Sequence, residues 1–333
     1  MRPRADPMLR FNGPTMGTTY SVTCVLDRDP GDKGNLSATL AGEIKTCLEQ
    51  VNSLMSTYRP DSELSRLNAH TAGTPFPVSP PLLHVLGRAI EISRQTHGAF
   101  DVTVGPIVNA YGFGPQDKPV TLPTDAELDR LKTRVGYQMI DLDAQAGTVT
   151  KGRPDLYIDL SAIVKGYAVD QVAAILDAHS IANYLVEIGG EIRVRGHNMS
   201  GHRWQIGVEK PTGQGRTVHR VLALTDTAMA TSGDYRNYYV NNGSRISHTI
   251  DPHTARPVTH HLASVTVLCE DCETADALAT ALMVLGPEEG YNWAERSGIA
   301  ALFLMRQGTD AYSEQETPGF TALTSSSPQG KGN

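Results

Sequence analysis

Apolar residues recur at helical spacing in several stretches of the chain. Between residues 37 and 55, Leu40, Ile44, Leu48, Val51 and Met55 lie three or four positions apart. This is the spacing of one buried face of an α-helix. The same pattern predicts helices over residues 81–96, 121–135, 163–177 and 275–285, the last of which ends at a glycine, Gly286.

Short runs rich in β-branched residues indicate strands between these helices. The first run covers residues 18–26. Further runs lie at residues 148–150, 157–160, 184–188, 192–195, 204–209, 220–225 and 264–268, separated by Gly, Pro, Asn or Asp. Helices and strands are mixed without a regular βαβ alternation, so the pattern predicts an α+β fold.

Composition and charge exclude some classes of function. The chain has 333 residues, 20 % of them charged, and a formal net charge of −7, with no concentrated basic patch. Nucleic-acid binding needs such a patch, and base stacking needs more aromatic residues than the two Trp, twelve Tyr and six Phe present. No Gly-x-Gly-x-x-Gly follows a strand, and no P-loop motif occurs. Nucleotide chemistry here would need another scaffold.

Two side chains on the helix predicted at 275–285 suit a hard cation. Asp276 and Thr280 stand at positions i and i+4, which share one helix face. A carboxylate and a hydroxyl are oxygen donors of the kind that Mg²⁺ prefers. One carboxylate is too little charge to hold the ion alone, so substrate phosphates would complete the shell. The alternative is a solvated or capping Asp and a Thr bonded to its own helix.

A second candidate lies where a predicted strand runs into a helix. Asp159 ends the apolar run, and Lys165 stands in the first turns of the helix that follows. The N–H groups at a helix start attract phosphate oxygens, and the lysine adds a positive charge suited to a pyrophosphate. The alternative is an ordinary helix cap beside a surface lysine.

Histidines and cysteines offer further candidates. His248 stands close to Asp251, and a carboxylate of this kind can fix the tautomer of a general base. His253, His260 and His261 follow closely, but their spacing is not that of metal ligands. Cys269 and Cys272 form a Cys-x-x-Cys pair without a second pair, which favours a structural role over redox or metal chemistry.

The order of several motifs resembles the ApbE family of FAD:protein FMN transferases. The resemblance runs from Gly13 to about Phe320 and rests on the following stretches: Gly13-Pro-Thr-Met-Gly-Thr-Thr-Tyr20, Ser56-Thr-Tyr-Arg-Pro-Asp-Ser-Glu-Leu-Ser-Arg-Leu-Asn68, residues 98–106 with Tyr111-Gly-Phe-Gly-Pro115, Ile158-Asp-Leu-Ser-Ala-Ile-Val-Lys-Gly-Tyr-Ala-Val-Asp170, Glu187-Ile-Gly-Gly-Glu191, Ala230-Thr-Ser-Gly-Asp234, His248-Thr-Ile-Asp-Pro252 and Ala275-Asp-Ala-Leu-Ala-Thr-Ala281.

The resemblance implies a fold and a set of site residues. It implies one large mixed α+β domain of the ApbE, T-fold-like type over residues 13–320, with mostly antiparallel strands and packed helices. An N-terminal arm over 1–12 and a flexible tail over 321–333 are expected around it. Mg²⁺ would be held by Asp276, Thr280 and the backbone carbonyl of Ala162. FAD would be bound by Met16, Tyr58, Ala99, Phe100, Asp101, Asp159, Lys165 and Ile250.

The chain departs from the family pattern at three places. Some members have a carboxylate where Ala279 stands and a Glu where Lys165 stands. The usual Asp-Pro-x-Thr-Gly becomes Asp251-Pro-His-Thr-Ala255, which replaces a turn glycine and removes no chemical group. The first change removes one potential metal ligand, and the second reverses a charge that faces the nucleotide.

The activity that the resemblance implies is transfer of FMN from FAD to a threonine of another protein, with release of AMP. His248 is the expected base for the threonine hydroxyl. The acceptor would be a flavoprotein of a membrane electron-transfer complex. FAD hydrolysis to FMN and AMP, and FAD binding without turnover, are the alternatives. The polar, proline-broken N-terminus predicts a cytoplasmic protein if the sequence is complete, and a periplasmic or membrane-associated one if a leader has been removed.

Overall fold

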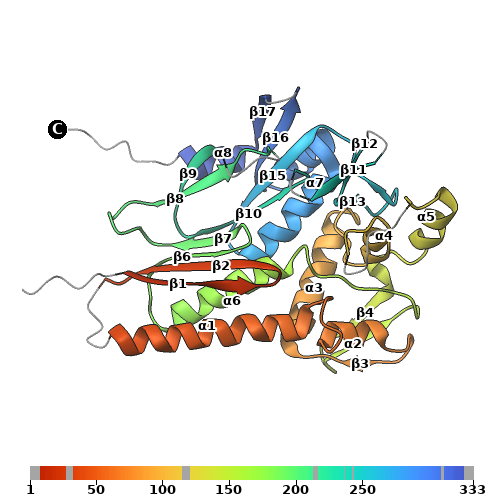
Figure 1. The fold of residues 1–333 in the computed structure, drawn as a ribbon, viewed down its shortest axis with the longest axis horizontal. Coiled ribbons are helices and arrows are strands. Elements are labelled where there is room, and N and C mark those ends of the chain that lie inside the picture. Colours follow the sequence, from red (N-terminus) through yellow and green to blue (C-terminus); the bar gives the residue numbers. More distant parts are fainter. Residues whose placement is uncertain are drawn as a thin grey trace, which may run out of the picture.

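An antiparallel sheet of eight strands forms the centre of the computed structural model, which describes residues 8–27, 33–114, 121–212, 217–235, 237–241, 244–308 and 311–325 (Figure 1). All neighbouring strands in this sheet run antiparallel. In spatial order the strands are β1 (Met8–Thr15), β2 (Thr18–Val25), β6 (Asn183–Ile188), β7 (Glu191–Arg195), β10 (Thr227–Gly233), β15 (Leu262–Cys269), β16 (Ala300–Gln307) and β17 (Ala311–Glu316).

Alternation along the strands gives the sheet two buried faces. On β10, Ala228 and Ala230 join the main core, whereas Met229 between them joins a second core. Successive strand residues point to opposite faces, so one strand serves both cores. The main core packs against helices α1 (Lys33–Met55), α3 (Pro80–Gln95), α6 (Val164–Ala178) and α7 (Cys272–Arg296).

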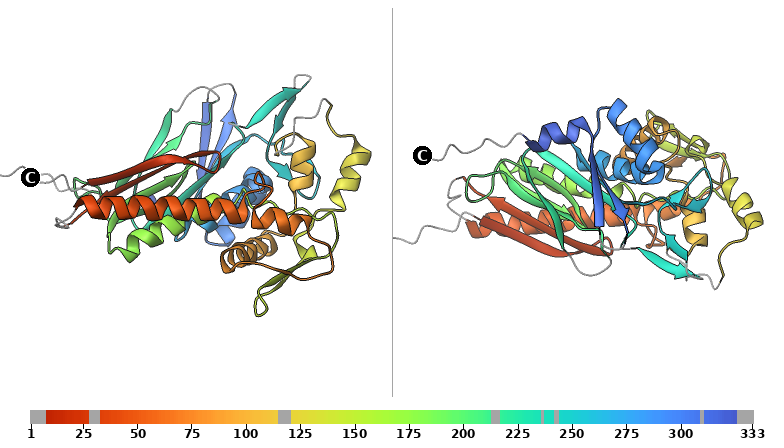
Figure 2. Two further views of the ribbon diagram at one scale, coloured as in Figure 1. Left: turned by 60° about the horizontal axis from the view of Figure 1, so that its bottom comes forward. Right: turned by 90° about the horizontal axis from the view of Figure 1, so that it is seen from above.

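The opposite face of the sheet is covered by smaller elements. Strands β8 (Trp204–Glu209) and β9 (Val218–Leu224) form a hairpin there, beside helix α8 (Pro318–Ser325). Figures 1 and 2 show the hairpin and α8 on one side of the sheet and α1 with α6 on the other. No helix in the described ranges is long and apolar enough to cross a bilayer.

The remaining elements gather at one end of the molecule, beside α3 (Figure 1). They include a three-stranded sheet and two separate hairpins. These elements are α2 (Glu63–Ala69), β3 (Phe76–Pro77), α4 (Gly105–Ala110), α5 (Asp125–Lys132), the 3₁₀ turn η1 (Tyr137–Met139), β4 (Ile140–Asp143), β5 (Thr148–Lys151), β11 (Tyr238–Asn241), β12 (Ser244–Ser247), β13 (Ile250–Asp251) and β14 (Arg256–Pro257).

The predicted α+β class with packed helices and antiparallel strands is confirmed, but the boundaries at both ends change. Residues 8–12, predicted as part of an arm, lie in β1 because that strand pairs with β2 along its whole length. Residues 321–325, predicted as part of a tail, belong to α8, in which Phe320 is buried. Residues 1–7, Pro115 and residues 326–333 lie outside the described part of the chain.

The strand predicted over residues 157–160 is wrong. The segment has no regular secondary structure and pairs with no strand in the described ranges. Its backbone is satisfied in other ways: the Asn68 side chain bonds both the N–H and the carbonyl of Ile158, at 2.8 and 2.9 Å. The Asp159 N–H donates to the Val102 carbonyl at 2.7 Å. Apolar spacing cannot distinguish such a segment from a ladder strand.

Helices α6 and α7 approach very closely at Gly166. A Cβ atom at this position would lie 2.2 Å from the Cys272 carbonyl oxygen, a contact that no side chain allows. Beside it, Asp170 of α6 accepts the N–H groups of Cys272 and Glu273 at 2.8 and 2.9 Å and so caps the start of α7. The missing side chain of Gly166 therefore allows the backbones of the two helices to approach this closely.

Helix α7 is interrupted where the sequence predicts its end. Gly286 has a φ of 81°, and Pro287 follows it, so the helix kinks there before continuing to Arg296. The His260 ring lies 2.9 Å from the Met283 carbonyl, one of the groups that the kink leaves without a helical partner. The first half of α7 is therefore a separate, buried helix.

Gly166→Ala tests the close crossing of α6 and α7. The added methyl group must push the two backbones apart, so we expect unfolding free energy to fall by at least about 2 kcal/mol. Gly42→Ala is the matched control, because that helical glycine in α1 faces open space. The control is expected to be neutral or to gain up to about 1 kcal/mol. Denaturant unfolding of both variants measures this, and equal stabilities would contradict the account.

Candidate functional site

One cavity of about 420 Å³ gathers eleven of the twelve predicted site residues. It lies between α6, α7, the end of β10 and the loops around residues 99–104 and 248–252. The residues come from far apart in the sequence, so the fold itself assembles the set. The predicted residues that line the cavity are Tyr58, Ala99, Phe100, Asp101, Asp159, Ala162, Lys165, His248, Ile250, Asp276 and Thr280.

Met16 is the predicted residue that does not line this cavity. It forms the two-residue turn between β1 and β2 with Gly17, and both have positive φ angles, 49° and 71°. The next residue, Thr18, packs against the position of Gly189, which does line the cavity. Met16 is thus a neighbour of the cavity, and its contact with FAD stays a prediction.

Asp276 lies at the crossing of α6 and α7. Its side chain is buried, and Oδ2 accepts the backbone N–H of Gly166 at 3.1 Å. In a regular helix that N–H would point to the carbonyl of Ala162, four residues earlier. The crossing therefore ties the carboxylate of one helix to the first turn of the other.

Lys165 bridges two carboxylates at the same place. Its Nζ lies 3.4 Å from both Asp276 oxygens and 3.0 Å from Oε1 of Glu191, the first residue of β7. Burial alone would lower the pKa of Lys165, but the two carboxylates outweigh it and raise that pKa above its usual value. Burial raises the pKa of Glu191 against the opposing effect of the ammonium group. Lys165 is therefore a firmly charged ammonium at the cavity.

The oxygen donors around Asp276 fit a hard cation. Thr280 lies one turn further along α7, and its Oγ1 is 3.0 Å from the Ser232 hydroxyl. Asp276, Thr280 and Ala162 all line the cavity. Carboxylate, hydroxyl and carbonyl oxygens are the ligands that Mg²⁺ prefers. No cluster of three or more His, Cys, Asp or Glu side chains suited to a metal occurs among the described residues, so this set depends on other oxygen ligands.

Asp101 organises the loop beside the cavity. The buried carboxylate accepts the N–H and the hydroxyl of Thr103 through Oδ1, at 2.8 and 2.6 Å, and the N–H of Tyr137 through Oδ2, at 2.9 Å. Burial raises the pKa of Asp101, although these three hydrogen bonds oppose the rise. Asp159 also supports a turn, because its Oδ1 accepts the Ser161 N–H at 2.9 Å. Both carboxylates shape the cavity wall.

His248 lines the cavity, but the prediction that Asp251 bonds its ring is wrong. Its Nδ1 lies 2.9 Å from the Asn237 carbonyl, whereas Asp251 accepts hydrogen bonds from the His253 N–H and the Thr254 hydroxyl. A bond from Nδ1–H to that carbonyl leaves Nε2 unprotonated, as a general base requires. Burial lowers the pKa of His248, so the ring is neutral near pH 7.

Aromatic and apolar groups form the rest of the wall. Tyr58 is 68 % exposed although it lines the cavity, so its ring is free to cover a planar ligand. Phe113 lies 6.1 Å from the His248 ring, measured between centroids. Phe100 and Ile250 are buried in the wall. The cavity thus has a polar side at α6 and α7 and an apolar side suited to a flat ring system.

Three residues that line the cavity were not predicted as site residues from the sequence: Glu191, Ser232 and Asn237. Glu191 and Ser232 stand in quoted motifs, but no role followed from those motifs alone. Asn237 acts through its backbone carbonyl, which any residue could supply, so the sequence carries no signal for it. A glutamate directly after two glycines was the clearest available sign, because such a turn brings a side chain close to a ligand.

The remaining histidine and cysteine candidates have structural roles. His253 and His260 bond the backbone carbonyls of His97 and Met283, which lie in different parts of the fold. Cys269 and Cys272 form no disulfide, and burial raises the pKa of Cys269 to about 12. A thiol that stays protonated is a poor metal ligand and a poor nucleophile. The structural interpretation of the Cys-x-x-Cys pair therefore fits best.

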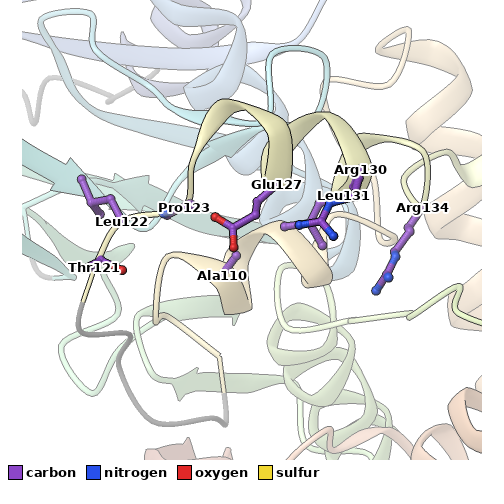
Figure 3. A pocket seen from close by; sticks show the side chains of 8 residues that line it. All are labelled: Ala110, Thr121, Leu122, Pro123, Glu127, Arg130, Leu131 and Arg134. Carbon is purple, nitrogen blue, oxygen red and sulfur yellow. The ribbon is translucent and has the colours of Figure 1, made fainter.

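A second pocket lies under α5 and lacks comparable chemistry. Figure 3 shows its side chains, including Glu127, Arg130 and Arg134. The Glu127 carboxylate is occupied by the N–H and hydroxyl of Thr124 in a helix cap, and Arg134 pairs with Asp155 at 2.9 Å. Glu127 and Arg134 of this pocket are thus engaged in a helix cap and an ion pair. None of the predicted site residues lines the pocket.

Comparison with known proteins points to one family. The model of the ApbE family matches residues 16–303. Two FAD:protein FMN transferases are similar over nearly the whole chain. The match to that of Vibrio cholerae is 46 % identical and covers 95 % of this chain and 93 % of the relative. The match to that of Haemophilus influenzae is 44 % identical and covers 95 % of this chain and 92 % of the relative. The crystal structure of the Pseudomonas stutzeri flavinyl transferase ApbE, apo form, superposes with a TM-score of 0.87 at 37 % identity, covering 98 % of this chain and all of that one.

Proposed function

Since the chain belongs to the ApbE family, we propose that it is an FAD:protein FMN transferase that links FMN to a threonine hydroxyl of an acceptor protein. The observation that carries the proposal is the single cavity that joins the α6/α7 crossing to His248. That cavity offers an oxygen-rich end with the Lys165 ammonium for a cation and a diphosphate, a neutral histidine and an apolar wall for the flavin or adenine ring.

The proposal includes a Mg²⁺ ion. Asp276, Thr280 and the Ala162 carbonyl would hold it, with phosphate oxygens of FAD as further ligands. When bound, the ion would neutralise the diphosphate and the charge that develops on the AMP leaving group. Support comes from the donor types that line the cavity at the crossing, because carboxylate and hydroxyl oxygens suit Mg²⁺.

The chain's own residues would carry the transfer as follows. Nε2 of His248 takes the proton from the acceptor threonine as its oxygen forms a bond to the FMN phosphorus. The bond from that phosphorus to the bridging oxygen breaks, and AMP leaves with that oxygen. The Lys165 ammonium stabilises the negative charge of the diphosphate as the bond breaks. The products are a phosphoester-linked FMN on the acceptor, AMP and a protonated His248.

Transfer is tested by incubating the full chain with FAD, Mg²⁺ and a threonine-bearing flavoprotein domain of a membrane electron-transfer complex. We expect the mass of the acceptor to rise by one FMN residue, and one AMP to appear for each labelled acceptor. The same domain with its threonine changed to alanine is the control. AMP without labelling would indicate hydrolysis of FAD, and neither product would indicate a protein that only binds FAD. Both results contradict the proposal.

The periplasmic location expected from the resemblance belongs to the same proposal. An acceptor in a membrane electron-transfer complex would need the enzyme on the side of the membrane where its threonine lies. Fractionation of cells that express the full gene, followed by detection of the protein in each fraction, tests this location.

His248→Ala should separate binding from chemistry. We expect FAD affinity to stay within about twofold and the transfer rate to fall roughly 10²–10⁴-fold, the usual contribution of a general base. In the unchanged enzyme, the rate should rise with pH through a pKa below the ordinary 6.5 and stay level near pH 7, because burial favours the neutral ring. His253→Ala, an exposed neighbour outside the cavity, should keep both rate and profile. An unchanged rate in His248→Ala would remove the residue from this role.

Asp276→Ala should abolish transfer that depends on Mg²⁺. The change removes the one carboxylate that α7 directs to the crossing, so added Mg²⁺ should no longer raise the rate at any concentration tested. Lost capping of the Gly166 N–H also costs stability, so thermal unfolding is measured in parallel. Folded protein with normal Mg²⁺-dependent transfer would place the ion elsewhere.

A further inference from the structure

The Glu191 carboxylate is buried at the cavity and only partly satisfied. Its side chain is 6 % exposed, and Oε1 pairs with Lys165. Oε2 has no hydrogen-bond partner among the residues that the structure describes. Buried polar atoms nearly always have a partner, so an oxygen of this kind next to a cavity indicates a ligand that binds there.

The backbone before Glu191 holds this carboxylate in place. Gly189 and Gly190 have φ angles of 64° and 112°, which turn the chain sharply from β6 into β7. Oε2 lies 3.5 Å from where a Cβ of Gly189 would stand, and Gly189 and Glu191 both line the cavity. A side chain fixed by such a turn cannot easily move out to water.

The Lys165 ammonium lies between two carboxylates. Asp276 reaches it from α7 and Glu191 from β7, at 3.4 and 3.0 Å. With both carboxylates ionised, the three groups sum to a net charge of about −1, which disfavours a diphosphate. A divalent cation added to them makes the sum positive, because a bound metal ion is usually the largest local charge.

Of the α7 residues that line the cavity, Asp276, Thr280 and Val284, Asp276 is the one carboxylate. Ala279, the residue before Thr280, is fully buried and has no donor atom in its side chain. We propose that Glu191 is the second carboxylate of the divalent-cation site and faces Asp276 across the Lys165 ammonium. The inference rests on the proposed function, because it concerns the same cation and the same cavity.

Binding of Mn²⁺ to the full chain tests this role without relying on turnover. Free Mn²⁺ is measured by electron paramagnetic resonance, with and without saturating FAD. We expect Glu191→Gln to weaken Mn²⁺ binding in the presence of FAD at least tenfold, and Glu191→Asp to restore part of the loss. Glu187→Gln is the matched control, because Glu187 stands just before the same turn, accepts the Gly190 N–H at 2.9 Å and does not line the cavity. This control should bind Mn²⁺ like the unchanged protein.

A second measurement separates cation binding from support of Lys165. FAD affinity is determined in EDTA from the change in flavin fluorescence. The proposal expects Glu191→Gln to bind FAD without metal as well as, or better than, the unchanged protein, because a negative charge near the diphosphate is gone. Weaker FAD binding in EDTA would mean that Glu191 acts by placing Lys165, and this would overturn the proposal.

Two further outcomes would overturn the role proposed for Glu191. Unchanged Mn²⁺ affinity in folded Glu191→Gln overturns the inference, while labelling of the acceptor by the unchanged enzyme would leave the proposed function standing. Absence of Mn²⁺ binding by the unchanged protein with FAD overturns the cation site as a whole. Thermal unfolding shows whether each variant is folded, and if Glu191→Gln is not, the smaller change to Asp provides the comparison.

Discussion

The bond between the Asp276 carboxylate and the Gly166 N–H is the contact on which the site depends. It exists because α6 and α7 cross without a side chain between them, with the Cys272 carbonyl against Gly166. The same crossing places Lys165 beside Asp276, and Ala162 lines the same cavity. Carbonyl, carboxylate, hydroxyl and ammonium groups are thereby gathered at a point where two helices and β7 meet. A different depth of packing would separate them.

The sheet supplies the rigidity that this crossing needs. Helix α7 packs on β10 and β15, whose inward residues are small or branched, and the opposite face is covered by the β8–β9 hairpin and α8. Both faces are buried, so the central strands carry apolar residues on both sides. Asp276 can remain in this environment because a backbone N–H and an ammonium group compensate it. Burial also lowers the pKa of His248, which lines the same cavity.

Much of this could be predicted from the sequence, but the contacts across the fold could not. Helical spacing located α1, α3 and α6, because each buries one continuous stripe. Strand β16 was missed because both its faces are buried, so its apolar residues do not alternate. At residues 157–160 the opposite error occurs, because a strand was predicted where none forms. The side chain of Asn68, from a helix distant in sequence, bonds the backbone of this apolar run. The partner of His248 is a backbone carbonyl, which leaves no mark in the sequence, and the unpartnered oxygen of Glu191 is visible only in three dimensions.

The central claim is that the α6/α7 crossing forms one site for a divalent cation and the FAD diphosphate. Crystals grown with FAD and Mn²⁺, measured near the manganese absorption edge, test it most directly. The account predicts an anomalous peak within ligand distance of Asp276, Thr280 and the Ala162 carbonyl, with the diphosphate on its open side. A diphosphate bound in the cavity with the peak elsewhere, or with no peak, would contradict it.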